Sequence, residues 1–417
     1  MARLKILHTS DWHLGRQLHE HPRDDEFDAF MTWMIHTIEK EQIDVLLIAG
    51  DIFDTSNPSY IAQQRYYNFC TKLSKTCCRH AVITSGNHDS TTFIDVPGAI
   101  LEHLNIHVVG QARFGMGKSG SPEDEIVVLK DRNGKDECIV AAVPLLTDGD
   151  VRYSAEGEDI TAKDEKMRLG VAAHYQAAAD ACERIRGGRE IPVIAMGHLY
   201  ITGGKIVEDD GVRSTYVGNL GGVSASIFSP AFDYVALGHL HVPQIVGNYA
   251  HIRYSGAPLP MGFGEAKQQK SVCIVLFDGK QPKISLYPIP QFHRMENIIG
   301  DKNTIETQLE QLTKENEEIY VSVTYTGNEY IDSVIELVQK ITNNAENVLC
   351  LNTQNKSQKT ACLQDNPTQI KNESLSDFNE YSVFDMLLAS ERPDITEEEK
   401  RQLTETYHEL LTLVNEQ

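Results

Sequence analysis

Five short apolar runs, each ending at a small residue followed by a polar one, constrain the fold of this chain more than any other feature. The runs cover residues 4–8, 45–49, 81–84, 193–196 and 234–237. Their length and their content of Val, Ile and Leu predict buried strands that end in loops. Helical periodicity in the intervening stretches, such as residues 25–40 and 59–74, predicts helices between them. We therefore expect a layered fold in which five strands deliver polar groups at the same end.

The five loops carry residues suited to binding divalent metal ions. In chain order they contain Asp11 and His13; Asp51 and Asp54 after Gly50; Asn87 and His88 after Gly86; His198 after Gly197; and His239 and His241 after Gly238. A lone histidine after a strand is usually structural, and a lone Gly-Asp pair is usually part of a turn. Five such elements in order at strand ends reverse that expectation. Because carboxylates can bridge two divalent ions while imidazoles and an amide oxygen complete each shell, the set predicts a metal centre. The other eleven histidines are expected to be structural or exposed.

The remainder of the chain suggests further modules. Residues 111–134 are expected to form loops and a hairpin of unassigned role, residues 164–186 a helix, and residues 253–289 further strands around a turn at residues 277–280. Beyond about residue 295 we expect a helix at 303–315, a strand at 319–325, a helix at 330–341 and a strand at 347–351. A polar tract then has the character of a flexible linker, and helices with an apolar stripe end the chain. The predicted divisions are residues 1–295, 296–352, 353–380 and 381–417.

Composition limits the classes of function. The formal charge is −22, from 38 basic and 60 acidic residues, and residues 291–417 alone carry −14 (10 basic against 24 acidic). Bulk attraction to a phosphate backbone therefore cannot be the main way of holding a nucleic acid, so such a ligand would require metals or a partner. No apolar run is long enough to span a bilayer and no signal peptide begins the chain, so we expect a soluble cytoplasmic protein. The eight cysteines are scattered without a C-x-x-C pair, which favours reduced structural thiols.

The ordered motifs resemble those of the calcineurin-like metallophosphoesterases over about residues 1–290. Longer matches are similar to one branch of that family, the bacterial SbcD nuclease subunits. These matches are residues 7–15, 50–55, 85–89, 197–199, 234–241 and 254–258. The resemblance implies an α+β protein: a four-layer α/β/β/α sandwich with a small α+β capping domain and C-terminal helices that bind the SbcC ATPase.

The resemblance also implies roles for individual residues. One divalent ion would be held by Asp11, His13, Asp51 and His241, and a second by Asp51, Asn87, His198 and His239. Mixed oxygen and imidazole ligands, together with the resemblance, favour Mn²⁺, with Mg²⁺ as the weaker alternative. His88 would be catalytic, and we predict that it donates a proton to the leaving group. Asp54 could orient His88, or could be an ordinary turn or capping residue.

The expected function is a two-metal DNA nuclease acting in DNA repair, recombination and replication. By resemblance, a homodimer of this chain joins two SbcC subunits and cleaves double-stranded DNA ends (3′ to 5′) and hairpins. ATP binding belongs to the partner, because the chain has no P-loop motif. Thr55-Ser56 stand where protein phosphatases of the superfamily carry Arg-Gly, which weighs against that branch. The alternatives are a phosphomonoesterase or small-molecule phosphodiesterase, and a non-catalytic architectural subunit.

Overall fold

The computed structural model describes residues 3–152, 159–205, 222–327 and 331–356, together with Leu403 and Tyr407. Apart from those last two residues, the expected helical segment at residues 381–417 lies outside the described part, as does almost all of the expected linker. The chain divides into two compact units: the larger contains residues 1–297, 316–322 and 347–351, and the smaller contains residues 298–315, 323–346 and those from 352 onward. Among the described residues, no helix has the length and apolar character needed to cross a membrane.

The larger unit contains two mixed six-stranded sheets. The first has the order β12 (Gln281–Pro288), β11 (Ser271–Asp278), β1 (Leu4–Thr9), β2 (Val45–Ala49), β3 (His80–Thr84) and β4 (Ile106–Val109). The second has the order β5 (Ile126–Lys130), β6 (Asp136–Ala142), β7 (Val193–His198), β8 (Tyr234–Gly238), β10 (Tyr249–Tyr254) and β9 (Gln244–Val246). Strands β1 to β4 are mutually parallel, as are β6, β7, β8 and β10. The carboxyl ends of the parallel strands in each sheet therefore share one edge.

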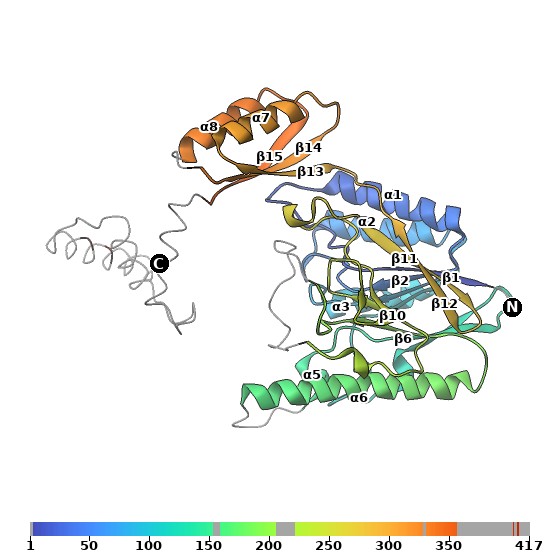
Figure 1. The fold of residues 1–417 in the computed structure, drawn as a ribbon. Helices are drawn as coiled ribbons and strands as arrows, with labels where there is room; N and C mark the ends of the chain where they lie inside the picture. The colour runs from blue at the N-terminus through green and yellow to red at the C-terminus, as the bar shows by residue number, and fades with distance from the viewer. Residues whose placement is uncertain are drawn as a thin grey trace. The chain divides into compact units, whose positions relative to one another are not determined.

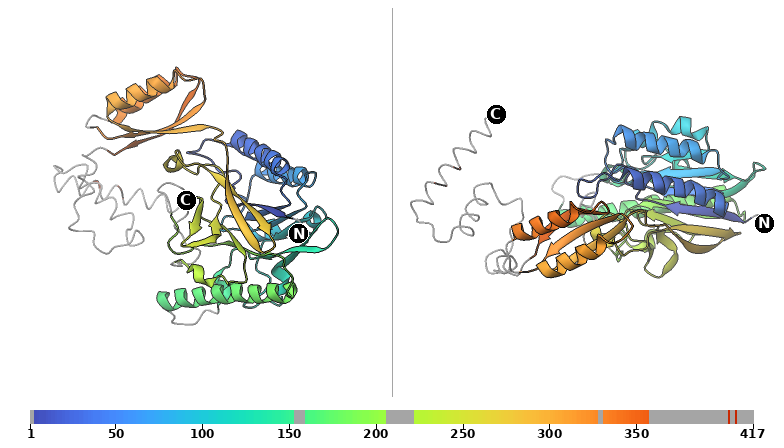
Figure 2. Two further views of the ribbon diagram at one scale, coloured as in Figure 1. Left: turned by 45° about the vertical axis from the view of Figure 1, so that its right-hand side comes forward. Right: turned by 90° about the horizontal axis from the view of Figure 1, so that it is seen from above.

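Helices cover the outer face of each sheet, which gives four layers (Figure 1 and Figure 2). The first sheet is covered by α1 (Asp24–Glu41), α2 (Tyr60–Leu73), α3 (Thr91–Asp95) and α4 (Gly98–Glu102). The second sheet is covered mainly by α6 (Ile160–Arg186), which follows the short α5 (Asp148–Val151). This arrangement confirms the predicted metallophosphoesterase sandwich.

Alternating side chains on the strands build the three interfaces between these layers. On β2, Leu46 and Ile48 pack beneath the helices of the first sheet, whereas Leu47 faces the second sheet. On β7, Ala195 packs against α6 and Met196 faces the first sheet. Because a strand places successive side chains on opposite faces, a run buried on both sides must be apolar throughout, as these runs are.

The sheets approach each other closely just below the predicted site. A β-carbon added to Gly238 at the end of β8 would lie 1.9 Å from the carbonyl oxygen of Ala49 on β2. Nearby, the hydroxyl of Tyr234 donates to Nδ1 of His8 at 2.9 Å, and Nε2 of His8 donates to the carbonyl of Leu237 at 3.2 Å. Burial lowers the pKa of His8 to about 3, so its ring is a neutral polar link between the sheets.

A separate α+β module follows the sandwich. Its three-stranded sheet has the order β13 (Arg294–Gly300), β14 (Ile319–Tyr325) and β15 (Val348–Asn355), and it carries α7 (Lys302–Leu312) and α8 (Ile331–Thr342) (Figure 1). Every residue of β14, the central strand of this sheet, is buried. The helices and strands lie close to their predicted positions, although β15 extends four residues beyond the strand expected at 347–351, into the start of the polar tract.

Residues 111–134, which sequence patterns leave without a role, contain the 3₁₀-helix η1 (Pro122–Glu125) and the first strand of the β5–β6 hairpin. Glu125 is fully buried and contacts Nε2 of His174 on α6 at 2.9 Å, and the ring of Phe114 stacks on the same histidine. His174 is therefore structural, as expected for a histidine outside the motif loops.

Candidate metal centre

The loops that follow β1 and β2 are joined through their backbones. The N–H of Asp11 donates to the carbonyl of Gly50, and that of His13 donates to the carbonyl of Asp51, both at 3.0 Å. The φ angles of Asp11, His13, Asp51 and His239 are 54°, 48°, 50° and 106°. Such angles cost a non-glycine residue of order 1–3 kcal/mol and persist only where the surrounding structure enforces them, which is common at functional sites. Four predicted ligands thus occupy strained and firmly held backbone.

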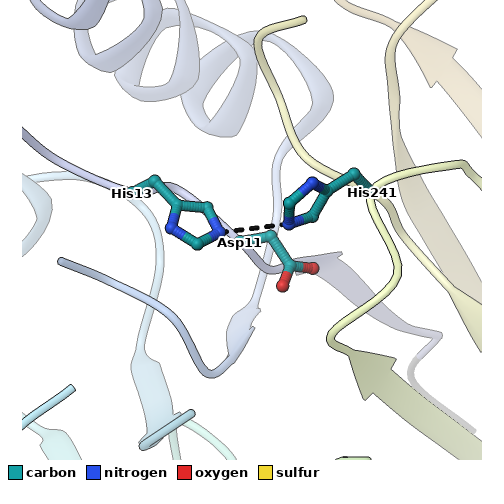
Figure 3. Close-up of side chains that lie close together, drawn as sticks. All are labelled: Asp11, His13 and His241. Atoms are coloured by element: carbon teal, nitrogen blue, oxygen red, sulfur yellow. Dashed lines mark hydrogen bonds between the residues drawn. The ribbon is translucent and has the colours of Figure 1, made fainter. Parts of the chain in front are cut away.

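The first group of donors consists of Asp11, His13 and His241 (Figure 3). The Nε2 atoms of the two imidazoles lie 3.1 Å apart, with the carboxylate of Asp11 beside them. One ligand atom from each residue lies within 4.8 Å of the others, and all three residues are buried. The loops after β1 and β8 therefore bring together the donors for one ion.

Asp51 lies between this group and a second one. Its Oδ2 is 3.7 Å from Nε2 of His13 and 3.3 Å from Nε2 of His198, and its Oδ1 accepts the N–H of His88 at 2.8 Å. One carboxylate thus faces both groups of imidazoles, the arrangement required of a bridging ligand.

The second group contains Asn87, His198 and His239. The amide oxygen Oδ1 of Asn87 lies 3.1 Å from Nε2 of His198 and 3.0 Å from Nδ1 of His239. Nδ1 of His198 donates to the carbonyl of Ala49 at 3.0 Å, so Nε2 carries the lone pair of the neutral ring and can bind a metal. With this group, all seven predicted ligands lie at one end of the sandwich.

The space around these donors is suited to ions. A β-carbon added to Gly50 would lie 2.3 Å from Nδ1 of His198, and one added to Gly86 would lie 2.3 Å from Oδ1 of Asp51. Both positions require glycine so that the donors can approach each other. The donor set contains only carboxylate and amide oxygens and imidazole nitrogens, a combination that suits Mn²⁺, Fe²⁺ or Zn²⁺. The residues present therefore fit two divalent ions.

Burial and mutual charge shift the pKa values of this cluster. Burial raises the pKa of Asp11 to about 6, opposed by His198 and reinforced by the charge of Asp51. Burial also opposes ionisation of Asp51, but the charge and hydrogen bond of His198 outweigh it and lower its pKa. In His198 itself, burial is outweighed by Asp51, so its pKa rises to about 9. Burial lowers the pKa of His239 to about 3. Buried carboxylates at close range are stabilised by a bound cation.

His88, the predicted proton donor, lies at the edge of the same cluster. Its Nδ1 donates to the main-chain carbonyl of Asp54 at 2.7 Å, and its ring packs edge-on against that of His13. Burial lowers the pKa of His88, with Asp51 acting in the opposite direction. The carboxylate of Asp54 lies 3.3 Å from both Nδ1 of His13 and Nη1 of Arg16. Asp54 thus touches His88 through its carbonyl and His13 through its side chain.

Three buried residues that support the ligands escaped prediction from the sequence. The carboxylate of Asp89 accepts the N–H groups of Ile52, Phe53 and Gly86 at 3.2, 2.9 and 2.9 Å, which ties the β2 loop to the β3 loop. Asp89 is the last residue of the G-N-H-D motif, but the motif does not indicate that its carboxylate accepts backbone hydrogen bonds from two loops.

The other two residues form an ion pair beneath His241. Nζ of Lys270 donates to the carbonyl of His241 at 3.1 Å and lies 2.9 Å from Oε2 of Glu265, which also accepts the N–H of Met261 at 2.7 Å. Both charged residues are almost fully buried. No motif marks them, because their partners are brought together only by the folded chain.

Comparison with known proteins agrees with this geometry. Residues 4–243 match the family model described as calcineurin-like phosphoesterase, and residues 291–392 match the one described as type 5 capsule protein repressor C-terminal domain. Fold and site thus define a metallophosphoesterase. The chain is 33% identical over 413 residues to the SbcD subunit of the SbcCD nuclease of Escherichia coli K12, covering 98% of each chain. It is 36% identical to that of Rhodobacter capsulatus (69% of this chain, 70% of the relative) and 32% identical to that of Bacillus subtilis 168 (65% and 66%). The chain therefore belongs to the SbcD branch of the calcineurin-like phosphoesterase family.

The glycine before Asp51 provides a test of the site. We expect Gly50→Ala to weaken Mn²⁺ binding by about tenfold or more, because its β-carbon would displace His198, and changes that disturb ligand orientation typically cost 10–100-fold. Titration calorimetry with Mn²⁺ measures this effect. The matched control is Gly149→Ala, whose β-carbon would meet no heavy atom within 4 Å. Equal affinity in the two variants would contradict the proposed placement of His198.

Proposed function

We propose that this chain is the catalytic subunit of an SbcCD-type nuclease and hydrolyses DNA phosphodiester bonds with two divalent ions, most favourably Mn²⁺. The observation that carries the proposal is the position of Asp51 between two groups of buried donors. When bound, a pair of divalent ions stabilises charge on the phosphate oxygens and lowers the pKa of water for in-line attack at phosphorus. Asp11, His13, Asp51 and His241 would hold one ion, and Asp51, Asn87, His198 and His239 the other.

His88 would protonate the leaving sugar oxygen, which is a poor leaving group. Because its Nδ1–H donates to the carbonyl of Asp54, the transferred proton would have to be the second one, which Nε2 carries only in the cationic ring. General acid catalysis of this kind contributes about 10²–10⁴-fold. Asp54 would act as a positioning residue, through this carbonyl and through the contact of its side chain with His13.

The proposed substrates are double-stranded ends, degraded from 3′ to 5′, and hairpins, processed in the bacterial cytoplasm during DNA repair, recombination and replication. The name of the relatives implies SbcC as the partner, and the formal charge of −22 supports one that supplies the grip on DNA. Residues 381–417 are proposed to bind SbcC, whose ATP state would control access to the site.

An exposed apolar patch supports a homodimer. It consists of Tyr60 and Ile61 on α2, Val96 directly after α3, and Ile100 on α4, which are 75%, 53%, 73% and 72% exposed. The ring of Phe53 joins these helices by packing against Tyr66 and Phe93, with centroids 5.4 and 5.5 Å apart. Exposed apolar side chains that gather on one surface are typical of an interface, and we propose that two copies related by a twofold axis cover these four mutually.

The first test is cleavage of linear and hairpin duplex DNA by the purified chain with Mn²⁺. The wild-type chain should cleave both substrates. Asp51→Asn should lose both metal binding and cleavage. His88→Ala should still bind metal, as measured by calorimetry, but its cleavage rate should fall by about 10²-fold or more. Loss of metal in His88→Ala would overturn its role as proton donor.

The same assay separates the alternative functions. Turnover of a small phosphomonoester without DNA cleavage, by the chain alone and with SbcC and ATP, would favour a phosphatase. Metal binding without any hydrolysis would favour an architectural subunit.

If two copies associate through this patch, one charged substitution in it should halve the mass of the protein in solution. Ile100→Glu should convert a dimer to a monomer in sedimentation equilibrium, because a buried unpaired carboxylate opposes association. Leu169→Glu on the exposed face of α6 (63% exposed) is the matched control and should remain dimeric. A monomeric wild-type chain would count against the assignment of the patch.

The SbcC assignment is tested by truncation. Removing residues 381–417 should abolish copurification with SbcC while leaving intrinsic metal-dependent cleavage intact, because the metal centre lies wholly within residues 11–241. Retained SbcC binding by the truncated chain would show that the docking segment lies elsewhere.

A further inference from the structure

An apolar hollow opens directly beside the second group of metal donors. Asn87, His198 and His239 form one wall of it. The others come from the loop after β6, from α6 and from the loop after β7, and include Leu145, Leu146, Met167, Val171, Tyr200 and Val223. It contains about 590 Å³ of space free of atoms, including its open mouth. Among the described residues, no charged side chain other than the histidines of the metal centre lines it.

The walls of this hollow are held in place before any ligand arrives. The hydroxyl of Tyr254 donates to the carbonyl of Leu199 at 2.7 Å and accepts the N–H of Ile201 at 2.9 Å. These bonds fix the loop on both sides of Tyr200. A β-carbon on Gly222 would lie 2.5 Å from the ring of Tyr200, so the glycine allows that ring to rest on the backbone. The ring of Tyr200 therefore forms an aromatic wall of the hollow, and the hydrogen bonds of Tyr254 and the backbone at Gly222 hold it in place.

We infer that this hollow is a nucleobase subsite, which receives the base of a nucleotide next to the phosphate held at the metal centre. The inference rests on the proposed function and deepens it. A phosphodiester bound near Asn87, His198 and His239 places its neighbouring nucleosides within reach of the hollow, because they share the same wall. Of the parts of a nucleotide, a phosphate is excluded from an uncharged apolar space, whereas a base is planar, aromatic and stabilised by leaving water and stacking on a ring.

The subsite has a consequence for the form of DNA that can be cut. A base inside a duplex is stacked and paired, so it reaches such a hollow only after leaving the stack, at a cost of a few kcal/mol that is smallest where pairing is already weak. Frayed ends and hairpin loops supply such bases. The hollow thereby favours the two kinds of substrate proposed above, without any contact that reads sequence.

The test compares ligands with and without a base. Calorimetry on the full-length chain with Mn²⁺ would measure the affinity for deoxyadenosine monophosphates carrying phosphate on the 5′ or 3′ oxygen. The corresponding baseless deoxyribose phosphates serve as the reference. We expect at least one nucleotide to bind about tenfold or more tightly than its baseless counterpart, from base–aromatic stacking. Equal affinities for both pairs would overturn the subsite.

Variants on α6 locate the effect. Met167→Trp should fill the hollow and bring the ratio of affinities close to one, whereas Leu169→Trp, on the exposed face of the same helix, should leave it unchanged. Tyr200→Ala removes the aromatic wall without overfilling the core and should also lower the ratio. A tenfold ratio that survives both Met167→Trp and Tyr200→Ala would place the base elsewhere and overturn the proposal.

The subsite and the nuclease function can fail separately. Cleavage of DNA with a ratio near one rejects the subsite alone. A tenfold ratio lost in Met167→Trp, combined with no DNA cleavage even with SbcC and ATP, supports the subsite and rejects the nuclease.

Discussion

The metal centre depends on the close approach of two sheets at Gly238 and Ala49. Its predicted ligands come from the ends of β1, β2 and β3 in one sheet and of β7 and β8 in the other, so any separation of the sheets would pull the two groups of donors apart. The carbonyl of Ala49 lies where a β-carbon of residue 238 would be, and it also accepts the hydrogen bond that orients His198. One main-chain carbonyl thus sets both the spacing of the sheets and the direction of a ligand. The neutral His8, linked to Tyr234 and Leu237, adds a polar tie across the same apolar interface.

The sequence predicted the strands and the ligand-bearing loops because both depend on local patterns. A run such as residues 45–49 is apolar throughout because both of its faces are buried, and parallel pairing then fixes which loops share an edge. The supporting groups could not be predicted in the same way. Lys270 follows His241 by 29 residues and reaches its carbonyl only in the folded sandwich, and Glu265 has no motif to distinguish it from a surface glutamate. The role of Asp54 divides between its carbonyl and its carboxylate, a distinction that residue type alone cannot make.

These supporting groups explain how the strained backbone persists. Positive φ at Asp11, His13 and Asp51 is unfavourable locally, yet the loops that contain these residues donate and accept hydrogen bonds among themselves. Asp89 accepts three N–H groups from the neighbouring loops, and the buried Lys270–Glu265 pair anchors the loop after β8 that carries His241. An unpaired buried charge is costly, so the charges of Lys270 and Glu265 are stable in the interior only because each has the other as a partner. The ligands are therefore oriented by the fold before an ion binds, which reduces the reorganisation that binding would require.

The apolar hollow lies against the polar metal donors, so two kinds of chemistry would recognise two different parts of a nucleotide. The carboxylates and imidazoles suit divalent ions, through which a phosphate would be bound, and the phosphate is the same in every nucleotide and carries no sequence information. The hollow beside them, with Tyr200 as a fixed wall, suits an unstacked ring, and rings are unstacked only where the duplex is interrupted. A chain with a formal charge of −22 gains little from the phosphate backbone at long range, so short-range selection of this kind has more weight in it than in a basic protein. If the chain acts as proposed, discrimination between intact and interrupted DNA would originate beside the metal centre, while the proposed partner would supply the grip on the duplex.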